Sequence, residues 1–295
     1  MNRLLGKTGI FFLHIFGFLP FWFMYLMADI TYTINYHIIG YRKHTVLKNL
    51  RNSFPEKTEK EIRQISKAFY HHFFDLIFET IKGFQASKET INKRVHYRNP
   101  EVLDELYERG KNVTLISGHY GNWEWISTLP LVIKHQVNVI YRSIENRVFD
   151  DYMKKIRSRF GMFLIPANNS LRIMLEFEKK GQLSATYYLA DQTASYDTKY
   201  WIMFLNQETL FFPGPEKVAT RFGQAVVFMD IQKVRRGYYE VEFTKLFDDA
   251  SQTKEFEVTK THVKFLENVI SNRPEFWLWS HKHWKHKRPE HTTLK

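Results

Sequence analysis

The chain has 295 residues, of which 44% are hydrophobic and 17% aromatic, and it carries a formal net charge of +12. This length suits one large domain with a substantial buried core, or one domain with an appendage. Because the sequence contains no cysteine, disulfides, thiolate metal sites and a cysteine nucleophile are excluded.

An uncharged apolar segment lies near the start of the chain. Residues 8–28 contain no Lys, Arg, Asp or Glu, and a run of this length can span a bilayer. Gly17 and Pro20 interrupt its middle, which also fits a kinked or re-entrant helix lying in one leaflet. A cleaved signal peptide is the alternative, because Arg3 and Lys7 precede the run, but no small-x-small cleavage site closes it. We therefore predict a hydrophobic membrane anchor over residues 1–30.

A basic helical segment is predicted over residues 31–93. Helices are expected at 31–51 and 58–84, and Thr58 with Glu61 forms a capping-box pattern at the start of the second helix. His71 and His72 lie among aromatic residues, which favours packing over metal binding, so no metal site is expected here. Basic residues beside an apolar anchor indicate contact with anionic lipid headgroups; they are Arg42, Lys43, Lys48, Arg51, Lys57, Lys60, Arg63 and Lys67. Nucleic acid is the competing partner for a basic protein, but no recognition motif accompanies the charge.

Alternating strands and helices characterise residues 94–295. Apolar runs predict strands at 113–117, 137–141, 162–165, 183–189 and 224–229, with an antiparallel strand at 238–244. Helices are expected between them at 146–160, 169–180 and 216–222, and a final helix at 256–270. This order predicts an α/β fold with a mixed, mostly parallel central sheet flanked by helices. The residues contain no Gly-rich nucleotide loop and no internal repeat.

An acid/base pair is the main candidate for chemistry. The strand at 113–117 ends at Gly118, which delivers His119 to a turn, and Glu124 follows five positions later. In a continuous helix five residues rotate the side chain by about 500°, so such a pair points roughly 140° apart. Only a pair that straddles a junction between a loop and a helix can converge, and a helix from 122 to 134 would give this pair such a junction. Spacing alone also fits a plain reading, in which His119 is a polar residue at a strand end and Glu124 is solvated.

Several stretches together resemble the lysophospholipid acyltransferase superfamily, and within it the late acyltransferases that add lauroyl or myristoyl chains during lipid A assembly. The resemblance covers nearly the whole chain. It includes the His-x4-acid block of His119 and Glu124, in the glutamate form typical of this branch. The other matching stretches are Tyr41-Arg42-Lys43, Asn49-Leu50 with Phe54-Pro55-Glu56, Tyr141-Arg142, Ala190-Asp191-Gln192, Phe211-Phe212-Pro213-Gly214-Pro215-Glu216, and the closing run from Pro274 to Lys285.

Two positions depart from the pattern of the family. His283 stands where the closing signature usually has arginine, so a phosphate or headgroup contact there would be weaker and dependent on pH. Phe204-Leu205-Asn206 replaces the Phe-Leu-Gly that often precedes the fourth block.

The resemblance implies transfer of a fatty acyl group from an acyl carrier protein or coenzyme A thioester to a hydroxyl of a lipid A precursor, without a cofactor. His119 would act as the general base and Glu124 would orient it. Arg142 is the candidate for stabilising the oxyanion, with backbone N–H groups near Gly121 as the rival and a salt bridge to Glu145 or Asp191 as the structural alternative. Asp191 and Gln192 would support the site, while Gly214, Lys217 and Arg221 are candidates for binding the acceptor.

The resemblance also implies a location at the inner membrane, with the catalytic domain on the cytoplasmic face. The acceptor stays open, because other members of the superfamily acylate glycolipids, aminolipids or lysophospholipids. A protein without enzymatic activity that binds anionic lipid or nucleic acid would explain the basic balance, but it would leave the residues around His119 without a use. The carrier protein is acidic, which gives the positive surface a second use.

Overall fold

A seven-stranded sheet forms the centre of the computed structural model, which describes residues 3–194, 200–290 and 292–295. The strand order is β1-β9-β8-β2-β5-β3-β4, and every neighbouring pair is parallel except β8 with β9. The predicted mixed, mostly parallel sheet is therefore confirmed. The strands are β1 (Val95–Tyr97), β2 (Val113–Ser117), β3 (Gln136–Tyr141), β4 (Phe163–Pro166), β5 (Ser184–Leu189), β8 (Ala225–Arg235) and β9 (Tyr238–Phe247), and β6 (Trp201–Phe204) pairs with β7 (Gln207–Leu210) apart from the sheet.

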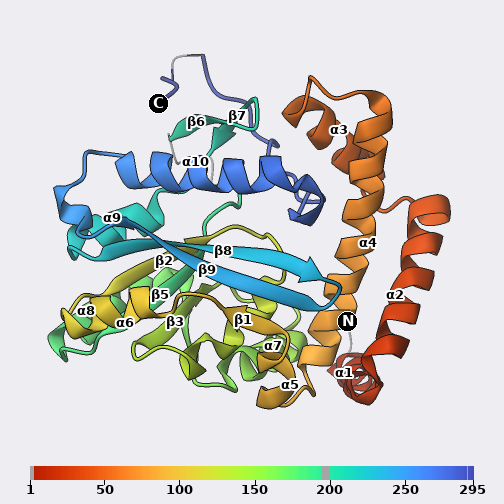
Figure 1. The fold of residues 1–295 in the computed structure, drawn as a ribbon, viewed down its shortest axis with the longest axis horizontal. Coiled ribbons are helices and arrows are strands. Elements are labelled where there is room, and N and C mark those ends of the chain that lie inside the picture. The colour runs from red at the N-terminus through yellow and green to blue at the C-terminus, as the bar shows by residue number, and fades with distance from the viewer. Residues whose placement is uncertain (1–2, 195–199, 291) are drawn as a thin grey trace.

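Helices cover both faces of this sheet (Figure 1). Alternate residues of β2 enter different cores: Leu115 packs with α6 (Glu101–Glu108) and the 3-10 helix η2 (Trp123–Leu131), and Ile116 with α8 (Ser170–Lys179), α9 (Gly214–Arg221) and α10 (Glu257–Asn272). Burial on both faces explains why the central strands are continuous apolar runs. The remaining short elements are α5 (Lys88–Asn92), α7 (Arg147–Ser158), η3 (Ala167–Asn169), η4 (Ala250–Gln252) and η5 (Pro274–Phe276).

The N-terminal residues form helices that pack along one side of the sheet (Figure 1). The apolar run is divided into α1 (Arg3–Phe18) and α2 (Phe21–Ile34), which meet at Pro20, and both pack against α4 (Glu59–Gly83). In the part of the chain that the structure describes, no helix has the length and apolar character needed to cross a membrane. The capping box of Thr58 and Glu61 at the start of α4 is confirmed.

Two predicted helices take a different form. The single helix expected at 31–51 is wrong: α2 ends in a π-helical turn, η1 (Asn35–Ile39), and Gly40 adopts a left-handed conformation before α3 (Lys43–Ser53). A left-handed residue ends a helix, and glycine adopts that conformation without a steric cost. The helix expected at 122–134 is the 3-10 helix η2, which contains Pro130. The proposed division of the chain at residues 30 and 93 stays a prediction.

Candidate active site

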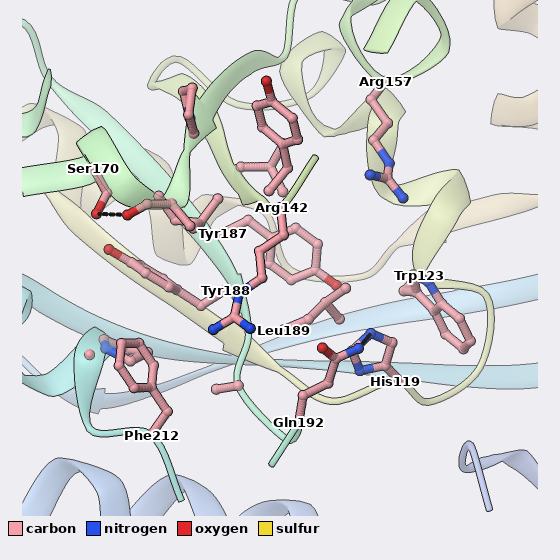
Figure 2. Close-up of a pocket in the computed structure, with 18 of the residues that line it drawn as sticks. His119, Trp123, Arg142, Arg157, Ser170, Tyr187, Tyr188, Leu189, Gln192 and Phe212 are labelled. Carbon is pink, nitrogen blue, oxygen red and sulfur yellow. Dashed lines mark hydrogen bonds between the residues drawn. The ribbon is translucent and has the colours of Figure 1, made fainter. Parts of the chain in front are cut away.

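Three parallel strands bring the polar candidates to one edge of the sheet. His119 follows β2, Asp191 and Gln192 follow β5, and Arg142 follows β3. Because β2, β5 and β3 are neighbours that run parallel, their carboxyl ends meet at the same edge. Figure 2 shows His119, Gln192 and Arg142 around one cavity at this edge.

Asp191 holds the inner nitrogen of the His119 ring. Its Oδ1 lies 2.5 Å from His119 Nδ1, while its Oδ2 accepts the backbone N–H of His119 at 2.8 Å and the indole N–H of Trp277 at 2.8 Å. Burial would raise the pKa of the Asp191 carboxyl, but the imidazole beside it and these hydrogen bonds hold that pKa well below its usual range. An ionised Asp191 therefore accepts a hydrogen bond from the protonated Nδ1. This contact fixes the position of the ring and keeps the proton of the neutral ring on Nδ1.

The outer nitrogen of His119 faces the cavity. The Nε2 atom lies 3.1 Å from the side-chain nitrogen of Gln192. With the proton on Nδ1, Nε2 is an acceptor, so the Gln192 amide donates to it. A hydroxyl that replaces this amide at Nε2 would meet a ring nitrogen whose lone pair can accept a proton.

The prediction that Glu124 orients His119 is wrong in this structure. Glu124 is instead paired with Arg157 of α7, whose Nη2 and Nε donate to its two oxygens at 2.6 and 3.1 Å. Trp123, the first residue of η2, packs its ring 5.1 Å from the His119 ring, and Glu124 is turned from that side toward α7.

The cavity beside His119 has a volume of about 840 Å³, a size typical of sites for small ligands. Its polar lining includes His119, Glu124, Arg142, Arg157 and Gln192. The apolar residues of its wall include Val139, Ile140, Met162, Leu189, Phe212 and Val218. The cavity therefore combines an apolar wall with one acceptor nitrogen and two guanidinium groups.

Arg142 is the second cation of the cavity, beside Arg157. Among the residues that the structure describes, it forms no hydrogen bond or ion pair, so the alternative of a salt bridge to Glu145 or Asp191 is not observed. Its guanidinium group points into the cavity that His119 lines (Figure 2). The rival donor at Gly121 is already used, since its N–H donates to the carbonyl of Phe276 at 3.2 Å.

The predicted binding residues around α9 are divided between different surfaces. Gly214 lines the His119 cavity, and a Cβ placed there would lie 2.0 Å from the ring of Phe212. Lys217 lines a neighbouring groove of about 750 Å³, which also contacts Phe212. Arg221 ends α9, where its guanidinium lies over the ring of Phe222. The structure therefore brings Gly214 to the site, but not Lys217 or Arg221.

Residues of the closing run, from Pro274 to Lys285, form hydrogen bonds that support the site. Besides the indole of Trp277, the backbone N–H of Leu278 donates to the carbonyl of His119 at 3.1 Å. The side-chain amide of Asn49 donates to the carbonyls of Trp279 and His281, at 3.0 and 3.1 Å. These contacts were not foreseen, although their residues belong to the quoted motifs. Arg157 was also missed, because an arginine in an amphipathic helix gives no distinct signal.

His283 does not contact a headgroup in this structure. Its ring is 3% exposed and stacks on Trp277 with a centroid distance of 4.3 Å. Burial lowers the pKa of His283 to about 3, so the imidazole is neutral at physiological pH. The interpretation of this position as a weak, pH-dependent headgroup contact is therefore wrong.

One cluster among the described residues has the geometry for a metal ion. Ligand atoms of Asp29, His71 and Asp75 lie within 4.8 Å of one another. Arg236 already donates to Asp29 and Asp75, at 2.6 Å each, and the cluster joins α2 to α4 rather than lining the His119 cavity. The guanidinium supplies the positive charge there, so the cluster gives no support for a metal site.

The chain is similar to proteins of one bacterial family. The bacterial lipid A biosynthesis acyltransferase family matches residues 3–286. A lipid A biosynthesis acyltransferase of Haemophilus influenzae is 24% identical over 283 residues, which cover 92% of this chain and 84% of that protein. Lipid A biosynthesis acyltransferase 2 of Shigella flexneri is 23% identical over 144 residues, which cover 49% of this chain and 45% of that protein.

Proposed function

The chain belongs to the bacterial lipid A biosynthesis acyltransferase family, and we propose that it moves a fatty acyl group from a carrier-protein or coenzyme A thioester to a hydroxyl of a lipid A precursor. The observation that carries this proposal is the acceptor nitrogen of His119, fixed by Asp191, at the edge of a cavity whose lining combines apolar side chains with Arg142. Hydrocarbon chains fit such a wall because burying apolar surface is favourable.

The reaction needs one base and one group that stabilises negative charge. Nε2 of His119 takes the hydroxyl proton while the hydroxyl oxygen attacks the thioester carbonyl carbon. The carbonyl oxygen then carries the negative charge, which Arg142 stabilises from the cavity wall. When the intermediate collapses, the C–S bond breaks and the imidazolium returns the proton to the leaving sulfur. An ester and a free thiol result, and no covalent acyl-enzyme is formed.

We further propose that the face formed by α1, α2 and η1 rests on the cytoplasmic leaflet of the inner membrane. Large apolar side chains are exposed on it: Phe11, Phe12, Ile15, Phe18, Trp22, Leu26, Ile30, Ile38 and Ile39. Exposed basic residues follow: Arg42 precedes α3, Lys48 lies on α3, and Lys60 and Lys67 lie on α4. An apolar face bordered by cations suits an interface that contains anionic lipid.

Replacement of His119 tests the proposal. The purified protein would be incubated with acyl carrier protein thioester and a lipid A precursor, and the product identified by mass spectrometry. Loss of a general base lowers the rate by about 10²- to 10⁴-fold, so we expect His119→Ala to lose activity to that extent. The control is His96→Ala, since His96 is exposed and has the same spacing to Glu101. Equal activities of the two variants would contradict the assignment of His119 as the base.

A further inference from the structure

A buried acid of α4 joins three parts of the molecule. The carboxylate of Glu79 accepts the side-chain amide of Asn122 and the hydroxyl of Tyr239 on Oε2, both at 2.7 Å. Its Oε1 accepts the hydroxyl of Tyr25 at 3.0 Å. Glu79 is 1% exposed, so a donor lost from its carboxylate is not replaced readily by water. Helix α4 lies between α2 and the sheet in Figure 1, as this bridging role requires.

Asn122 connects Glu79 to the turn that carries His119. Its Oδ1 accepts the backbone N–H of Trp125 at 3.3 Å and so caps the start of η2. The indole N–H of Trp125 donates to the backbone carbonyl of Glu79 at 3.2 Å. Trp123, between these two residues, packs its ring on His119. Glu79 therefore holds η2 at two points, on either side of the residue that contacts the base.

Tyr25 connects Glu79 to the apolar face. Trp22 and Leu26, its neighbours on α2, are 68% and 47% exposed, while the hydroxyl of Tyr25 is enclosed. A Cβ on Gly237 would lie 1.9 Å from that hydroxyl oxygen. Asp29, one turn farther along α2, is held by Arg236, which also binds Asp75 of α4. Because Tyr25 and Asp29 are held closely, a movement of α2 would displace the Tyr25 hydroxyl from Glu79.

We propose that Glu79 is a positioning residue that couples the seating of α2 on a lipid surface to the placement of the turn formed by residues 118–122. The inference rests on the proposed function, because that function gives the turn its catalytic role. The carboxylate cannot shift toward one partner without changing its bonds to the others. Contact between the exposed face of α2 and lipid thus stabilises the geometry in which His119 works.

A matched pair of tyrosine variants tests the coupling. Tyr25→Phe and Tyr239→Phe each remove one hydroxyl from the same carboxylate, but only Tyr25 lies on α2. Hydrogen exchange of the backbone amides in residues 118–125 would be measured with and without vesicles of phosphatidylethanolamine and phosphatidylglycerol. In the wild type and Tyr239→Phe, vesicles should slow exchange by about 10-fold or more, the range expected for one hydrogen bond to a buried charged group. In Tyr25→Phe, vesicles should have no effect on exchange.

Steady-state kinetics on acceptor lipid in the same vesicles give a second measurement. Tyr25→Phe should lower kcat by about 10-fold, with KM and vesicle binding unchanged within about twofold, and Tyr239→Phe should lower kcat less. The coupling would be overturned if vesicles did not slow hydrogen exchange in the wild type, or if kcat fell equally in both variants. Glu79 would then have a packing role only. If hydrogen exchange follows the expected pattern but the protein shows no acyl transfer, the coupling is supported and only the proposed function is refuted.

Discussion

Replacement of Asp191 by asparagine provides the sharpest test of how His119 is activated. The substitution keeps the shape of the side chain, and its oxygen can still accept the indole N–H of Trp277. Its amide nitrogen, however, is a donor, and placed against Nδ1 it requires the proton to move to Nε2. The nitrogen that faces the cavity could then no longer accept a proton from the acceptor.

The size of the effect follows from the geometry. The bond between Nδ1 and Asp191 is 2.5 Å long and buried, and an equivalent change in a Ser-His-Asp triad lowers kcat by about 10⁴-fold. We expect Asp191→Asn to lower kcat by about 10³- to 10⁴-fold in steady-state acyl transfer, with KM little changed. Glu124→Gln is the matched control, because Gln keeps an acceptor for Arg157, and its kcat should fall by less than about 10-fold. A larger loss in Glu124→Gln than in Asp191→Asn would refute this assignment.

Three further measurements address the oxyanion, the core and the donor. Arg142→Ala should lower kcat by about 10²- to 10³-fold in the same assay, with partial recovery in Arg142→Lys; a wild-type rate would exclude Arg142 as the stabilising group. Burial lowers the pKa of His262 to about 4, below its value of about 6.5 in the unfolded chain. As the pH falls, the unfolded state therefore binds the proton first, and about 3 kcal/mol of the free energy of unfolding should be lost between pH 6.5 and pH 4. Urea unfolding of His262→Leu should show a smaller loss over this range, and a loss equal to that of the wild type would contradict this assignment. Lys282 and Lys285 are exposed in the closing run, where they could meet an acidic carrier protein. Charge reversal at both should therefore raise KM for a carrier-protein thioester more than for acyl-coenzyme A, and equal effects would place these lysines on the acceptor or the membrane.

The sheet could be predicted closely because its strands are buried on both faces. The strand expected at 113–117 is β2, with the same bounds, and the antiparallel strand expected at 238–244 lies within β9. The short strand β1 and the pair of β6 and β7 were missed, since runs of three or four residues show too little periodicity. At Gly40 a local backbone conformation overrode a helical pattern that continued beyond it.

The site was predicted in part. Residues at strand ends could be placed, because parallel topology brings His119, Arg142 and Gln192 to one edge. The carboxylate that pairs with His119 could not be chosen from spacing, since Asp191 comes from another strand and Glu124 is paired with Arg157 of α7. The lysine and arginine of α9 were chosen by proximity to Gly214 in the chain, and the helix carries them to other surfaces.

The indole of Trp277 reaches a carboxylate that precedes it by 86 residues, and this has a consequence for the newly made chain. Synthesis at about 5–20 residues per second separates the emergence of these two residues by roughly 4 to 17 seconds. During that interval Asp191 lacks one of its donors, and the His119 carbonyl lacks the Leu278 N–H. The unfinished polypeptide therefore lacks two of the contacts that support the acid/base pair, while the proposed lipid-facing helices α1 and α2 are already made. On the proposed function, we therefore expect a chain that stops before Trp277 to bind lipid vesicles but to be inactive.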